Sequence, residues 1–103
     1  MTKVIIEVKS LKNNDLIGKV VLSKKGRDKN HLYVVKDSLS DDYVILINGS
    51  TKTVQMPKKK NLKHLEVLDD VDDETKESII SKDRGTDLKI KRFLKIKGIV
   101  KEG

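Results

Sequence analysis

Short runs of β-branched and aliphatic residues recur along the first two thirds of the chain, and turn-forming residues interrupt them about every eight to twelve positions. This spacing is typical of short strands joined by tight turns. The chain has 103 residues, of which 36% are hydrophobic, so it has room for one small core. Closing a sheet on itself would hide its edges in so short a chain. We therefore expect a mainly β fold in the form of a small barrel.

Six segments are expected to be strands, namely residues 3–8, 16–23, 31–36, 43–48, 51–56 and 62–68. Asn48 and Gly49 predict a type I′ hairpin that pairs the fourth of these strands with the fifth, because both residues tolerate positive φ. Pro57 is expected to end the fifth strand, since proline cannot donate a backbone hydrogen bond to a central ladder. Residues 58–61 are then expected to form a loop.

The apolar residues after position 68 recur at helical spacing. Asp72 or Asp73 is expected to cap a first helix, and Gly85 is placed to end it. Thr86 is expected to cap a second helix, which carries an apolar stripe on one face. A short helical tail should therefore follow the β domain.

Charge divides the chain in a similar way. Residues 1–64 carry fourteen Lys and Arg against six Asp and Glu, residues 65–83 carry two against eight, and residues 84–103 carry seven against two. We therefore expect a barrel over residues 1–68 and an acidic-then-basic helical tail over residues 69–103. The basic barrel should attract polyanions, of which nucleic acid is the commonest in a cell.

The composition also sets limits on compartment and chemistry. There is no cysteine, which excludes disulfides, thiolate zinc sites and a cysteine nucleophile. The longest apolar runs are far too short to span a membrane, and the amino terminus lacks the layout of a secretory signal. No glycine-rich phosphate loop, nucleophile elbow or histidine-based metal spacing occurs. We expect a cytoplasmic protein that is not an enzyme and has no cofactor, metal or membrane partner.

Two basic clusters are the candidate binding residues. The first lies in a polar hairpin loop over residues 24–30, and the second follows Pro57. Arginine can bind a phosphate through two parallel hydrogen bonds, whereas lysines act as point charges. Asp28 within the loop is expected to cap the turn or orient Arg27, and Tyr33 and Tyr43 are expected in the core. The candidate RNA-binding residues are Lys24, Lys25, Arg27, Lys29, Lys58, Lys59, Lys60 and Lys63.

The sequence Gly18-Lys-Val-Val-Leu-Ser-Lys-Lys-Gly-Arg-Asp-Lys29, followed by a hydrophobic strand, resembles the KOW motif of several ribosomal proteins and NusG-type transcription factors. With Asn48-Gly49 and the basic run of residues 57–65, it is similar to small bacterial KOW-domain RNA-binding proteins. Those are related to a KOW-containing large-subunit ribosomal protein of archaea and eukaryotes. The resemblance covers about residues 16–66 and implies an SH3-like barrel that binds RNA. KOW motifs usually have glycine where this chain has Asn30, and asparagine tolerates the same left-handed turn.

Two hypotheses follow from the residues and the resemblance together. The first is an RNA-binding module of the translation machinery, docking on structured RNA such as ribosomal RNA through its basic loops. The second is a protein-interaction module of the transcription or translation machinery that uses the barrel and the charged tail. In that case the tail either folds back as an acidic cover over the basic face or docks on a partner protein.

Overall fold

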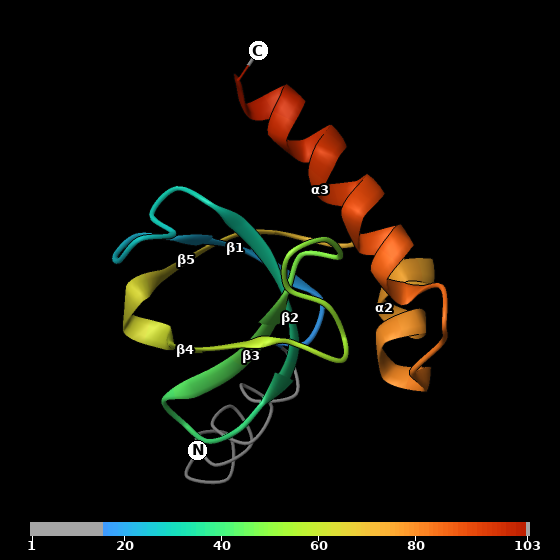
Figure 1. Cartoon of the computed structure of the whole chain (residues 1–103), viewed down its shortest axis with the longest axis horizontal. Coiled ribbons are helices and arrows are strands. Elements are labelled where there is room, and N and C mark those ends of the chain that lie inside the picture. The colour runs from blue at the N-terminus through green and yellow to red at the C-terminus, as the bar shows by residue number, and fades with distance from the viewer. Residues whose placement is uncertain (1–15, 103) are drawn as a thin grey trace, which may run out of the picture.

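The computed structural model describes residues 16–102, with side chains to residue 97, so the expected strand over residues 3–8 lies outside the described residues (Figure 1). One antiparallel sheet is followed by two helices. The strands are β1 (Lys19–Ser23), β2 (Leu32–Ser38), β3 (Tyr43–Ile47), β4 (Lys58–Asn61) and β5 (Leu65–Asp70), and the helices are α2 (Asp73–Ser81) and α3 (Thr86–Glu102). The prediction of a mainly β fold with C-terminal helices is confirmed.

The sheet is curled. Its strand order is β4-β3-β2-β1-β5, so β4 and β5 form opposite edges. Yet only the 3₁₀ turn η1 (Leu62–His64) separates these two strands along the chain, which forces the edges toward each other. Within residues 16–102 no ladder joins β4 to β5, so the barrel is not closed by hydrogen bonds. The arrangement is compatible with a small SH3-like β fold.

Alternating side chains divide the core between the two faces of the sheet. The inner, concave cluster contains Val21, Tyr33, Val35, Val44, Leu46 and Leu65. The outer cluster contains Val20, Val34 and Ile47 from the sheet, together with Val71, Ile79, Ile90 and Leu94 from the helical region. Residues 69–103 therefore supply four of the seven buried residues of the outer cluster, three of them from the helices, and the predicted tail is an integral layer of the core.

The first helix begins as predicted, because the Asp72 carboxylate accepts a hydrogen bond from the backbone N–H of Thr75 (2.8 Å). Its predicted end is wrong. Lys82, with φ of 60°, takes the left-handed cap position expected for Gly85. Thr86 begins α3, and its buried hydroxyl donates to backbone carbonyls, one of which is that of Ser78 at 3.0 Å. This bond fixes the joint between the two helices.

The predicted hairpin at Asn48-Gly49 is also wrong. Residues 51–56 form an irregular loop, and the partner of β3 is β4, which the sequence pattern placed in a loop. Gly49 does adopt positive φ (+78°), but it packs against α3, where a Cβ would stand 2.1 Å from the carbonyl oxygen of Asp87. Pro57 precedes a strand instead of ending one, a position at which its missing N–H disrupts no ladder.

Candidate nucleic-acid interface

The backbone of the loop between β1 and β2, residues 24–30, is held by internal hydrogen bonds. Gly26 and Asn30 both adopt positive φ, at 91° and 75°, so the structure confirms that asparagine preserves the left-handed turn at position 30. The Asn30 N–H donates to the carbonyl of Ser23 (2.7 Å) and closes the loop at its base. The four cationic side chains of the loop are exposed; they are Lys24, Lys25, Arg27 and Lys29.

Asp28 turns inward from this loop and is 9% exposed. It does not orient Arg27 as the sequence suggested. Its carboxylate instead accepts hydrogen bonds from the hydroxyls of Ser23 (2.9 Å) and Tyr33 (3.0 Å) and from the ammonium of Lys60 (2.8 Å). These bonds tie the loop to β1, β2 and β4. Tyr33 is therefore buried, as predicted, and its hydroxyl has a specific partner.

The charges at the base of the loop are fixed at neutral pH. Burial acts to raise the pKa of Asp28, but the hydrogen bonds from Lys60, Ser23 and Tyr33 and the charge of Lys58 outweigh burial. The net effect holds the pKa of this carboxyl well below its ordinary value of 3.8. Burial, together with the bond to Asp28 and its negative charge, raises the pKa of Tyr33 to about 12. At neutral pH the base of the loop is therefore held by the ionised carboxylate of Asp28 and the neutral phenol of Tyr33.

The second predicted cluster lies on a strand and not on a loop. Alternation along β4 sends Lys58 and Lys60 toward Asp28, and Lys60, with a side chain only 10% exposed, also donates to the carbonyl of Lys25 (2.8 Å). Lys59 points to the other side and is exposed, and its ammonium lies 5.0 Å from the ring centroid of Tyr43. Tyr43 is itself 38% exposed, so its predicted place in the core is wrong.

The turn η1 brings a further basic residue to the loop. Lys63 is exposed, and the backbone N–H of Lys24 donates to the carbonyl of His64 (2.8 Å), joining η1 to the loop. Partial burial and then the charges of Lys25, Lys63 and Lys60 lower the pKa of His64. The sequence predicted only a polar contact for His64 and did not include it in the candidate site, although its place next to Lys63 was the available signal. The contributions of these three lysines show that they lie close to the imidazole.

Six of the eight predicted residues are therefore exposed. Lys24, Lys25, Arg27 and Lys29 of the loop and Lys63 of η1 form a basic face, whereas Lys59 lies on the opposite side of β4 from Lys58 and Lys60. No ion pair joins any of these six to a carboxylate within the part of the chain that the structure describes. The backbone of Asp42 lies beside Leu62, so the turn between β2 and β3 borders this face with acidic residues. Lys58 and Lys60, the other two predicted residues, are both ion-paired with Asp28 beneath the face.

The acidic segment lies at the other end of the sheet. Asp70 pairs with Lys19 at 2.9 Å, and Asp69 is ion-paired with Lys97 of α3. Lys19 begins β1, whereas the basic loop leaves the opposite end of that strand at Ser23. Asp69 and Asp70 therefore engage cations of β1 and α3 and do not cover the basic face.

Within the described residues, no group of three or more histidine, aspartate or glutamate side chains is placed to hold a metal ion. The same residues contain no helix with the length and apolar character needed to cross a membrane. A scan of protein-family models finds none that matches this chain, and a search of curated proteins finds no match either.

Proposed function

We propose that this protein binds structured RNA by its phosphate backbone, through the basic face that the loop and Lys63 form. The observation that carries the proposal is the combination of exposed cations, which have no ion pair among the described residues, with a loop backbone held from beneath by Asp28. A fixed loop loses little conformational entropy on binding, so more of the electrostatic free energy appears as affinity. Neutralising phosphates also releases condensed counterions, which drives association at moderate salt.

The resemblance to KOW-domain RNA-binding proteins supports RNA as the polyanion. We extend it to ribosomal RNA as the ligand, with the protein working in the cytoplasm alongside the translation machinery. Arg27 is the residue suited to bidentate phosphate contact, while the lysines contribute charge. With Tyr33 buried, the loop offers no aromatic platform for bases, so recognition depends on phosphate, 2′-hydroxyl and shape.

The test is fluorescence anisotropy with labelled fragments of ribosomal RNA and an unrelated structured RNA, over a salt series. The logarithm of the affinity should fall linearly with the logarithm of the salt concentration. The slope should be about −0.7 to −0.9 for each phosphate contacted. The double variant Lys24→Gln/Lys25→Gln, which removes two charges from the loop, should bind both RNAs more weakly. The matched control, Arg84→Gln/Arg92→Gln, removes two exposed charges, one from the turn between the helices and one from α3, and should retain affinity.

Arg27→Ala should weaken binding more than Lys59→Gln if the guanidinium grips a phosphate with two bonds. Absence of binding by the wild-type protein at low salt would refute the proposal. So would equal affinities of the loop variant and the wild type.

A protein-interaction role is the second candidate, and exposed apolar residues on the helices favour it. Ile80, Leu88 and Ile96 are each more than half exposed. If α3 docks on a protein of the ribosome, Ile96→Glu should weaken binding to intact ribosomes and leave affinity for naked ribosomal RNA unchanged. Equal losses for both ligands would exclude this role.

A further inference from the structure

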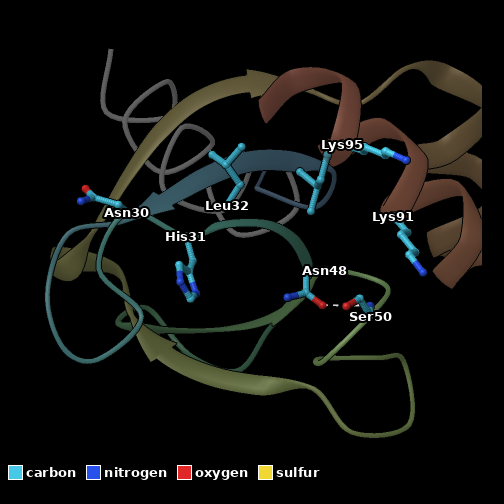
Figure 2. A pocket seen from close by; sticks show the side chains of 8 residues that line it. Asn30, His31, Leu32, Asn48, Ser50, Lys91 and Lys95 are labelled. Carbon is cyan, nitrogen blue, oxygen red and sulfur yellow. Dashed lines mark hydrogen bonds between the residues drawn. The ribbon is translucent and has the colours of Figure 1, made fainter. Parts of the chain in front are cut away.

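A shallow groove of about 500 Å³ runs between the sheet and α3, next to the basic loop. Figure 2 shows His31 and the turn at Asn48 and Ser50 on one side, and the helix carrying Lys91 and Lys95 on the other. No residue that lines the groove is acidic. The groove is thus bounded by cations and neutral hydrogen-bonding groups, a lining that attracts a polyanion and repels a cationic surface.

The lysines of α3 fall into two sets. Lys89 lies 3.5 Å from the carboxylate of Glu74, and Lys97 is paired with Asp69. Lys91 and Lys95, which line the groove, are exposed and have no ion pair among the described residues. Four residues apart on one helix face, these two repel each other in the free protein. A bound anion would offset this repulsion, which no carboxylate of the described residues does.

The groove is formed before any ligand binds. Asn48 holds its own turn, because its side-chain oxygen accepts from the backbone N–H groups of Ser50 and Lys52, both at 2.9 Å. Gly49 between them lies in close contact with the backbone of α3. The helix is anchored from beneath by Ile90, which is fully buried. Both walls are therefore fixed, and binding requires no large rearrangement of either.

The groove is also continuous with the basic face. Asn30, which closes the loop, lines the groove together with His31, and Lys29 of the basic face immediately precedes it. A nucleic-acid strand bound on the loop would therefore extend directly into the groove past Asn30 and His31. Leu94 contributes apolar surface against which a ribose can rest.

We propose that this groove is a second phosphate-binding surface for the same RNA, with Lys91 and Lys95 as its charged contacts. The RNA backbone then passes from the loop across Asn30 and His31 to α3, so that the barrel and the helix bind one strand together. This inference rests on the proposed function and assigns an RNA-binding role to α3, which the resemblance to KOW proteins does not reach.

The test uses the full chain and a labelled RNA hairpin as the probe, with Lys91→Gln/Lys95→Gln as the groove variant. Affinity should fall about tenfold at physiological salt, and the slope of log affinity against log salt should become shallower by about 1.5, as expected for two lost phosphate contacts. The charge-matched control is again Arg84→Gln/Arg92→Gln, which lies outside the groove. Thermal unfolding should be the same for both variants, since all four residues are exposed.

The outcomes separate the two proposals. If the loop variant weakens binding while the groove variant matches the control, the groove inference is overturned and RNA binding through the loop stands. Equal weakening by the groove variant and the control would mean that only net charge matters, which also overturns the groove. If the wild-type protein does not bind the hairpin or ribosomal RNA, both proposals fail.

Discussion

Replacing Asp28 with asparagine should lower the free energy of unfolding by about 2–3 kcal/mol at pH 7. Asparagine keeps one oxygen that can accept from Ser23 and Lys60, but its amide group faces Tyr33 and Lys58 in place of the second carboxylate oxygen. Removing one member of a buried ion pair costs about 3–5 kcal/mol. We expect a smaller loss for Asp28→Asn because Lys60 is slightly exposed and keeps its hydrogen bond to the backbone carbonyl of Lys25.

The measurement is urea unfolding followed by far-ultraviolet circular dichroism, because the chain has no tryptophan to report by fluorescence. The midpoint should fall without a change in the m-value, since the surface exposed on unfolding is the same. Glu66→Gln is the control, because it removes an exposed carboxylate and should change stability by no more than about 0.5 kcal/mol. A similarly small change for Asp28→Asn would refute the idea that this charge holds the loop.

Acid provides an independent check. Because the folded protein lowers the pKa of Asp28 below 3.8, the stabilisation from its charge is complete above that pH. It is lost as the pH falls from about 4 toward the depressed value in the folded state. The difference in stability between the wild type and Asp28→Asn should therefore stay constant down to about pH 5 and narrow below pH 4. A difference that grows on acidification would contradict the assignment.

Three further predictions concern other positions. The pKa of Tyr33 is raised to about 12, so one phenol of the wild type should ionise late in an alkaline absorbance titration, and Tyr33→Phe should remove that step. Because the raised pKa favours the neutral phenol, its contribution to stability is complete below pH 10 and declines as the pH rises toward 12. Gly49→Ala should destabilise the protein by at least about 2 kcal/mol, since its Cβ would collide with the backbone of α3, and a fall in melting temperature of less than about 4 °C would contradict this contact. RNA binding should raise the pKa of His64, because phosphates would offset the lysine charges that lower it in the free protein; an unchanged imidazole titration by NMR would place the RNA elsewhere.

Much of the sheet could be predicted, because β-branched runs such as that of β1 combine a local preference with a buried face. The strand β4 could not, because its sequence of three lysines and an asparagine has no apolar period. It is held by pairing with β3 and by the distant carboxylate of Asp28, and neither contact is local in sequence. The Asn48-Gly49 pair predicted a hairpin from local geometry alone, whereas packing against α3 determines the conformation there.

The candidate site shows the same limit. Sequence spacing identified the exposed cations of the loop, because a turn rich in lysine and arginine projects them into solvent. It could not separate Lys59 from its neighbours Lys58 and Lys60, since that distinction depends on which face of β4 points toward Asp28. Nor could it associate Lys91 and Lys95 with His31, about sixty residues away along the chain, because only the packing of α3 on the sheet brings them together.

The shared outer cluster has a consequence for how the chain folds as it is made. Val20, Val34 and Ile47 are synthesised early, but the residues that cover them end with Leu94. At about 5–20 residues per second, a nascent chain would carry an uncovered apolar sheet face for several seconds. During that interval the apolar face of the sheet is exposed to solvent and to other proteins. In a chain terminated before α3 this face would stay exposed. Stalled or truncated products of this gene should therefore aggregate or engage chaperones, while the completed chain does not.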